Sequence, residues 1–204
     1  MTWPAFIAQF HAKGRDKAEG YFPFHFEGMS DDELARARVM MEARGVEGDT
    51  TDLDGLRLIG DAATIAKLDA ARMADAAHGV AFEAARRETL FALTRDADHL
   101  APLLVLLDAP EDRNSAFAAQ ALARHPLPSS FAPLLAARML DGRHEVALLW
   151  IVKAWLSARG EPVWQVPVFD ANLPFIRQVM AARPADRSTV LDEWQRMKSP
   201  FSPD

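Results

Sequence analysis

The chain has 204 residues, half of them apolar, which is enough for one sizeable core or for an elongated stack of roughly one to two domains. It contains no cysteine, so disulfide bonds, thiol nucleophiles and thiolate metal sites are excluded, and a reducing, cytoplasmic location is expected. The formal net charge of −6 argues against nucleic acid as a partner, because nucleic-acid-binding proteins usually carry a basic stripe.

The negative charge is concentrated in the first part of the chain. Residues 1–80 hold 14 acidic and 9 basic side chains, whereas residues 81–204 hold 15 and 14. A basic protein is therefore the more natural electrostatic partner, although a mildly acidic surface also serves solubility alone. The N-terminal sequence lacks the features of a secretory signal, and no run of about 18 apolar residues occurs, so neither a membrane span nor a membrane partner is expected.

Two helices are predicted in the N-terminal region. The first runs from Trp3 to Lys13 and is followed by an irregular aromatic stretch, Tyr21–Phe26. Ser30 is the expected N-cap of the second helix, because Glu33 lies three residues further on and completes the pattern of a capping box. This helix should end at Gly45, since glycine often terminates a helix.

From residue 49 onward, the apolar spacing indicates a succession of paired helices. A short helix capped by Thr51 should end near Gly60, Asp96 is available for a later turn, and Gly160–Phe169 forms the one longer loop. The remaining helices are predicted at residues 62–77, 81–94, 98–107, 113–124, 130–140, 143–158, 170–182 and 186–198. The expected domains are an N-terminal helical cap region over residues 1–48, helical repeats over residues 49–198 and a tail over residues 199–204.

Short sequence similarities mark the second helix of several pairs. The sequence Ala-Pro-Leu-Leu at residues 101–104 recurs at residues 132–135, and Ile65–Leu68 occupies the equivalent place in an earlier pair. A period of 30 to 40 residues built of two helices is typical of α-solenoids. In addition, the segment Asp54–Leu68 resembles a HEAT unit, in which an aspartate makes the turn between two helices. This resemblance covers residues 49–182 and implies an all-α fold, a right-handed α–α superhelix.

The sequence lacks the motifs of common catalytic and metal sites. It contains no HExxH, GxSxG, Walker or GxGxxG pattern, and no two of its six histidines are spaced as metal ligands on a helix. The acidic run Asp49–Gly55 lacks an acid at the first ligand position of a calcium loop, so Asp52 and Asp54 are interpreted as acids near a helix N-terminus. We therefore expect no metal, no cofactor and no catalytic residue. Helix-end acids such as Glu83 and Glu88 would become catalytic candidates only in a pocket that shifts their pKa.

The aromatic residues fall into three groups. The stretch Tyr21–Phe26 either covers the open end of a helical stack or binds a partner. Trp150 and Trp155 lie in the most apolar predicted helix and are expected in the core. Trp164 lies in a proline-flanked loop, where partial exposure would let it contact a partner.

Protein binding is the function that these patterns favour. Within that class, the chain resembles HEAT-like immunity proteins encoded beside secreted antibacterial toxins. The resemblance lies in the N-terminal helical region, the capped helix that begins at Met29–Glu33, an acidic linker and the small number of repeats. It implies a bacterial protein that covers the active site of a toxin, and the 18 arginines against 5 lysines fit a GC-rich bacterial genome.

Two alternatives remain open. The chain also resembles HEAT-like DNA-repair glycosylases, which cradle DNA on a basic concave face and would need a local arginine ridge. The residues available for that ridge are Arg86, Arg87, Arg124 and Arg138. The other alternative is an adaptor or assembly factor. For protein binding, the expected contact residues lie in acidic turns and in the one long loop. They are Asp49, Asp52, Asp54, Asp96, Asp98, Glu111, Asp112 and Trp164.

Overall fold

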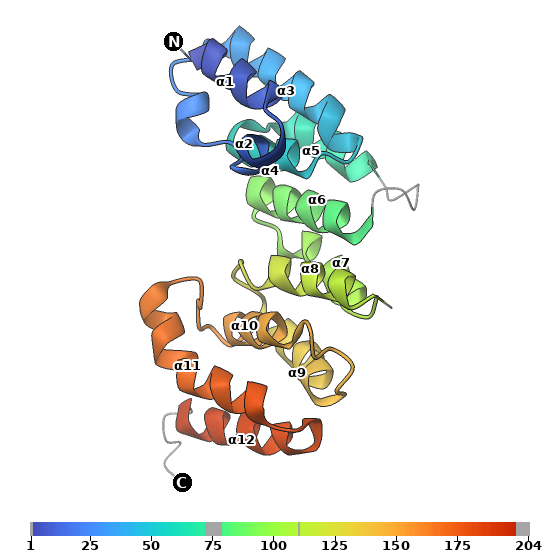
Figure 1. Ribbon diagram of the computed structural model, residues 1–204, viewed down its shortest axis with the longest axis vertical. Helices are drawn as coiled ribbons and strands as arrows, with labels where there is room; N and C mark the ends of the chain where they lie inside the picture. The colour runs from blue at the N-terminus through green and yellow to red at the C-terminus, as the bar shows by residue number, and fades with distance from the viewer. Residues whose placement is uncertain (1, 72–78, 110, 199–204) are drawn as a thin grey trace. The chain divides into compact units, whose positions relative to one another are not determined.

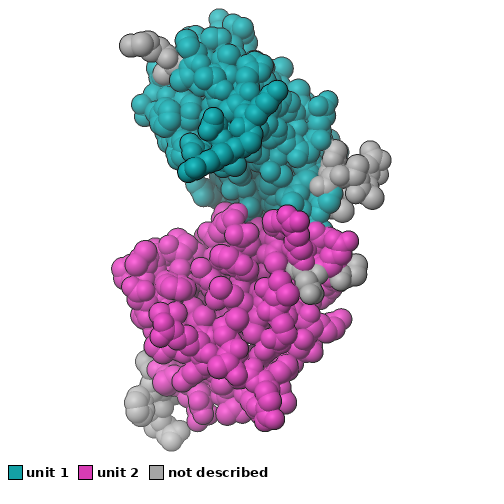
Figure 2. Space-filling model, in the orientation of Figure 1, with its two compact units in different colours: residues 1–100 teal, residues 101–204 magenta. Residues whose placement is uncertain are grey.

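The computed structural model describes residues 2–71, 79–109 and 111–198. In these residues the chain is helical and contains no β-strand, which confirms the all-α prediction. None of the helices in this part combines the length and the apolarity that crossing a bilayer requires. The chain divides into two compact units, residues 1–100 and residues 101–204, so the boundary predicted after residue 48 lies inside the first unit (Figure 2).

The first unit is built from helices and short 3-10 helices (η). They are α1 (Thr2–His11), α2 (Gly14–Ala18), η1 (Pro23–His25), α3 (Asp31–Val46), α4 (Thr50–Ile59), α5 (Ala62–Ala70), α6 (Gly79–Thr94) and η2 (Ala97–His99) (Figure 1). The helix α4 packs against both α3 and α6, and α5 packs against α3 and α6. The core therefore lies between these helices, and α1 covers it at the N-terminal side through Phe6 and Phe10.

The predicted capping box of α3 is confirmed. The Ser30 hydroxyl accepts a hydrogen bond from the Glu33 backbone N–H at 3.3 Å, and the Glu33 carboxylate accepts one from the Ser30 N–H at 2.8 Å. The helix α3 continues to Val46, one residue beyond the end predicted at Gly45. Gly45 does not terminate the helix but allows Leu53 of another helix to pack closely against it. A Cβ at Gly45 would lie 3.0 Å from a Leu53 methyl group, and the left-handed conformation belongs to Gly48 instead.

The residue that caps α4 is Asp49, not Thr51 as predicted. The Asp49 carboxylate accepts hydrogen bonds from the backbone N–H groups of Thr51 and Asp52 at 3.2 and 3.3 Å. Asp61 caps α5 in the same way, through Ala63 and Thr64. Both aspartates satisfy amides that the first turn of a helix leaves unpaired. The helix predicted at residues 62–77 is present as far as Ala70, and its predicted end lies outside the described residues.

Buried ion pairs lie within and between the helices of the first unit. The clearest is on α6, where the Glu83 carboxylate accepts two hydrogen bonds from Arg86, at 2.7 and 2.8 Å, and one from Arg87 at 2.6 Å. Arg86 also donates to the Leu68 carbonyl at 2.6 Å and so connects α6 to α5. Burial alone would raise the pKa of Glu83, but the hydrogen bonds from the two arginines outweigh it and lower the pKa below its usual value.

We expect the Glu83→Gln variant to lose pH-dependent stability. A lowered carboxyl pKa means that the folded state binds fewer protons, so the stabilisation is present above the ordinary glutamate value of about 4.3 and disappears as the pH falls through the folded-state pKa. The free energy of unfolding should drop by about 1–3 kcal/mol at pH 7, and the difference from the parent should shrink toward pH 3. Urea unfolding at several pH values measures this, with Glu193→Gln on an exposed position as control. A difference that stays constant with pH would contradict the assignment.

The second unit follows the same helical pattern. Its elements are α7 (Ala101–Leu106), α8 (Asp112–Leu122), η3 (Ser129–Phe131), α9 (Ala132–Leu140), α10 (Leu148–Ala158), α11 (Val166–Ala181), η4 (Pro184–Asp186) and α12 (Arg187–Lys198). The helix α10 packs against α8, α9 and α11 and so occupies the centre of this unit (Figure 1). Trp155 is buried there, with its ring centroid 5.6 Å from that of Phe175 and 4.9 Å from that of Trp194.

Two helices of the second unit begin where the sequence did not predict. The helix predicted at residues 143–158 starts only at Leu148, so Val146 lies in a preceding turn and is exposed. The helix predicted at residues 170–182 starts earlier, at Val166, because Pro167 fits the first turn of a helix, where no backbone N–H is needed. Trp155 is in the core as predicted, whereas Trp150 is only half-buried.

Candidate interaction surface

Three of the predicted contact residues, Asp49, Asp52 and Asp54, form ion pairs with basic residues of the first unit. Asp49 forms ion pairs with Lys17 and with Arg44, whose Nη2 lies 2.9 Å away, and Asp54 pairs with Arg57 at 2.7 Å. Burial alone would raise the pKa of Asp49, but the hydrogen bonds from Lys17 and Arg44 lower it below its usual value. Asp49 thus connects α2, α3 and α4 and is only partly accessible.

The prediction that Asp52 lies in an exposed acidic turn is wrong. Its side chain is completely buried, with Oδ2 2.8 Å from Arg44 Nε, and Oδ1 accepts a hydrogen bond from the Tyr21 hydroxyl at 2.7 Å. Burial raises the pKa of Asp52, and burial together with the hydrogen bond to Asp52 raises the pKa of Tyr21 well above its usual value. Asp52 faces inward because Asp49, three residues earlier, caps α4 and fixes the rotation of its first turn.

Three of the remaining predicted acids, Asp96, Asp98 and Glu111, lie on the surface. Asp96 is exposed and caps η2 by accepting from the Asp98 N–H at 2.9 Å, and Asp98 is itself exposed. Glu111 is exposed and accepts a hydrogen bond from the Asn114 side chain at 2.9 Å. The backbone of Asp112 begins α8, and its side chain lies outside the described part of the structure. The carboxylates of Asp96, Asp98 and Glu111 are therefore accessible at the surface.

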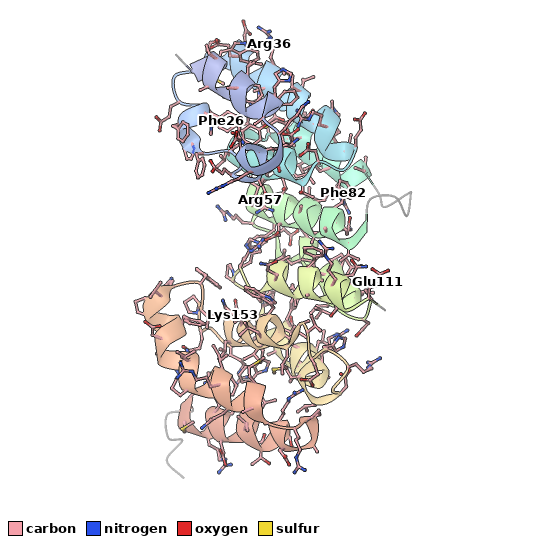
Figure 3. All side chains as sticks on the ribbon, viewed as in Figure 1. Phe26, Arg36, Arg57, Phe82, Glu111 and Lys153 are labelled. Carbon is pink, nitrogen blue, oxygen red and sulfur yellow. The ribbon has the colours of Figure 1, made fainter. Side chains whose placement is uncertain are left out.

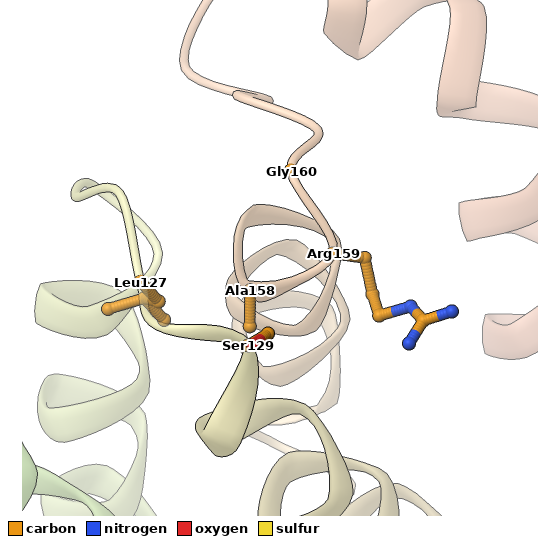
Figure 4. A pocket seen from close by; sticks show the side chains of 5 residues that line it. All are labelled: Leu127, Ser129, Ala158, Arg159 and Gly160. Atoms are coloured by element: carbon orange, nitrogen blue, oxygen red, sulfur yellow. The ribbon is translucent and has the colours of Figure 1, made fainter.

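A pocket lies at the C-terminal end of α10 in the second unit, ahead of Trp164 in the sequence. The pocket has a volume of about 390 Å³ and is formed where the chain leaves α10 and where it connects α8 to η3 (Figure 4). Its lining residues are Leu127, Ser129, Ala158, Arg159 and Gly160. In Figure 4, Ser129 and Ala158 face each other across the pocket, and the Arg159 side chain extends away from them.

The exit of the chain from α10 positions Trp164. Gly160 has a φ of +82°, a left-handed conformation that favours glycine and turns the chain sharply after the helix. Ser157 fixes the neighbouring segment by donating a hydrogen bond to the His125 carbonyl at 2.5 Å. Beyond the turn, the side chain of Trp164 is 42% exposed and that of Val166 is 71% exposed. The predicted exposure of Trp164 is therefore confirmed, and Val166, two residues later, adds a second exposed apolar side chain that was not predicted.

A second shallow pocket lies on the outer side of α3. It has a volume of about 320 Å³ and an almost entirely apolar lining of Ala35, Arg36, Val39 and Met40 (Figure 3). The Arg36 guanidinium lies 4.4 Å from the centroid of the Trp3 ring, and Val39 is exposed. This pocket offers apolar area without an exposed aromatic side chain, which makes it a weaker candidate for a binding hot spot than the surface around Trp164.

A serine, a histidine and two aspartates converge in the second unit, although no sequence motif indicates them. The Ser115 hydroxyl lies 3.3 Å from His144 Nδ1, and His144 Nε2 lies 3.5 Å from Asp108 and 3.6 Å from Asp141. A nucleophilic serine needs open space beside its hydroxyl for the reacting carbonyl, but Ser115 is only 2% exposed. Arg138 also holds Asp108 at 2.7 Å. The cluster joins Ser115 on α8 and His144 in the segment before α10 to Asp108 after α7 and Asp141 after α9.

Arg86, Arg87 and Arg138, which the glycosylase alternative would place on a basic ridge, form ion pairs inside the chain. Arg86 is buried, and both Arg86 and Arg87 pair with Glu83, while Arg138 pairs with Asp108. A neutralised or buried guanidinium contributes little to a positive field at the surface. The prediction of an exposed basic ridge is wrong for Arg86, because its guanidinium satisfies Glu83 and the Leu68 carbonyl.

The aromatic stretch Tyr21–Phe26 is buried at some positions and exposed at others. Phe26 is buried against Phe6 and so covers the core beneath α1, while the Tyr21 ring packs on both. Phe22 and Phe24 are exposed and stack on each other with centroids 5.7 Å apart. The same short segment therefore closes the core and leaves two aromatic rings on the surface.

Within residues 2–71, 79–109 and 111–198, no group of three or more histidine, aspartate or glutamate side chains is arranged to hold a metal ion. The acids of the run Asp49–Gly55 are bound by arginine, lysine, tyrosine and backbone amides. No family model, no curated protein and no solved structure matches the chain.

Proposed function

We propose that this protein is a protein-binding module, built from HEAT-like helical pairs in a right-handed α–α superhelix, and that its partner docks on the second unit around Trp164. The single observation that carries this proposal is the exposure of Trp164 and Val166 in the segment that follows α10, close in sequence to the pocket that Gly160 lines. Tryptophan is enriched among the residues that dominate binding energy, especially where a neighbouring pocket can be filled and closed off from water.

The narrower form of the proposal is that the partner is a secreted antibacterial toxin, which this chain neutralises in the bacterial cytoplasm by covering its active site. The support for this form is the resemblance to HEAT-like immunity proteins together with the exposed carboxylates of Asp96, Asp98 and Glu111. Exposed acids attract a basic partner over several ångströms and increase the rate of encounter. The internally paired Asp49, Asp52 and Asp54 contribute less to that attraction.

The test is co-expression of the full chain with the toxin-like protein encoded directly beside its gene. We expect the chain to rescue growth and to form a complex that survives size-exclusion chromatography. If no neighbouring toxin is neutralised and none co-purifies, the narrower proposal fails. Binding of duplex DNA at low salt would instead favour the glycosylase alternative.

The Trp164→Ala variant should weaken the complex at least about tenfold, because it removes the largest exposed ring at the proposed contact. The matched control is Met180→Ala on α11, since Met180 is exposed to the same 42% as Trp164 but lies outside the proposed contact. Titration calorimetry of the purified complex compares the two. Equal losses of affinity in both variants would place the partner elsewhere.

A further inference from the structure

Lys153 lies between two aromatic rings of the second unit. Its Nζ is 4.7 Å from the centroid of Trp150, three residues earlier on α10, and 5.0 Å from the centroid of Phe169, in the first turns of α11. Figure 3 shows Lys153 on α10. The flat faces of aromatic rings attract an ammonium group, and they fix its position without neutralising its charge.

Lys153 differs in this respect from the other lysines. Lys17 pairs with Asp49, Lys67 with Glu42 at 2.8 Å and Lys198 with Glu161 at 2.7 Å, whereas Lys13 is exposed to water. Lys153 is half-buried, and no carboxylate of the described residues lies within ion-pair distance of it. Desolvation by burial lowers its pKa, which reflects the missing counter-charge.

The surroundings of Lys153 are apolar and partly open. Trp150 and Phe169 are half-buried, so each ring keeps some open surface beside Lys153. The nearest acid along α11, Asp170, is exposed but forms no ion pair with Lys153. An unneutralised cation in such surroundings is complementary to a single carboxylate that arrives together with apolar groups.

We propose that Lys153, held by Trp150 and Phe169, binds an aspartate or glutamate of the protein partner that is flanked by apolar side chains. The inference rests on the proposed function in so far as the partner is a protein. It adds that the partner, although basic overall, must present one acidic residue to Lys153. The carboxylate would replace the water that now solvates the Lys153 ammonium, and the flanking apolar groups would cover the Trp150 and Phe169 rings.

The site can be tested without knowing the partner. The probes are two capped peptides, Leu-Glu-Leu and Leu-Gln-Leu, which differ only in the charge of the central residue. Each is titrated into the full chain while the Lys153 side-chain signals are followed by NMR. We expect a saturable shift of Lys153 and a preference of about tenfold for the glutamate peptide. Equal binding of both peptides, or no shift of Lys153 at about 10 mM peptide, would overturn the proposal.

Two substitutions separate charge from packing. In both variants the peptides are titrated against the indole signal of Trp150, which lies beside position 153. Lys153→Met keeps an apolar chain between the rings and should abolish the preference for the glutamate peptide, whereas Lys153→Arg should retain it within about threefold. If toxin binding is unchanged in Lys153→Met but lost in Trp164→Ala, this inference fails and the proposed function stands. If the peptide preference depends on Lys153 and no toxin is bound, the carboxylate site stands and the proposed toxin fails.

Discussion

The Trp155→Ala variant is expected to lose about 3–5 kcal/mol of the free energy of unfolding, the largest effect of any single truncation in the second unit. The Trp155 ring is almost completely buried on α10, the helix that contacts α8, α9 and α11. Its ring meets Trp194 of α12 edge-on and Phe175 of α11 at a tilt. Truncation would leave a cavity where three helices meet, and the surrounding rings could not close it without moving the helices.

Urea unfolding followed by circular dichroism measures this loss without relying on tryptophan fluorescence. The Trp164→Ala variant is the control, because it removes the same side chain from an exposed loop and should cost less than about 1 kcal/mol. Trp155→Phe should lie between them, since it keeps an aromatic ring in the cluster. A loss below about 1.5 kcal/mol for Trp155→Ala would show that the packing around α10 does not determine the stability of this unit.

The sequence predicted helices well where local signals are strong. The capping box at Ser30 and Glu33 depends on neighbours within one turn, and its geometry appears in the structure as predicted. The central position of Trp155 followed from its place in the most apolar helix. Boundaries failed where tertiary packing competes with local preference, as at Gly45, which makes room for Leu53 on another helix instead of ending α3.

The interaction surface was only partly predictable, for a related reason. The exposure of Trp164 follows from its proline-flanked loop, which is a local feature. The pocket at the end of α10 and the contact of Lys153 with Phe169 join segments that are separate in the sequence, such as Leu127 with Gly160, and no periodicity reveals them. The same limitation explains the wrong placement of Asp52, whose partner Tyr21 lies in a different segment of the first unit.

The Asp52→Ala variant is the second substitution with a large expected effect, and it contrasts two aspartates of one helix. Removing the Asp52 carboxylate leaves the half-buried Tyr21 hydroxyl without its acceptor and leaves Arg44 with Asp49 as its only acidic partner. Because breaking one side of a buried charged network leaves the other side uncompensated, we expect a loss of about 2–4 kcal/mol. Asp54→Ala removes an exposed carboxylate from its ion pair with Arg57, which still pairs with Glu88, and should cost less than about 1 kcal/mol.

The comparison of Asp52 with Asp54 decides whether the acids of α4 belong to the fold or to a partner. Thermal unfolding of the two alanine variants gives the stability, and Asp52→Asn, which keeps an acceptor for Tyr21, should recover part of the loss. Asp98→Lys on the surface should leave unfolding unchanged within about 0.5 kcal/mol while slowing association with a basic partner. If Asp52→Ala were as mild as Asp54→Ala, the Tyr21–Asp52–Arg44 network would carry no stability and Asp52 would again be a candidate for partner contact. A large loss confined to Asp52 instead leaves charge-based recognition to the exposed turns, where substitution changes binding without unfolding the chain.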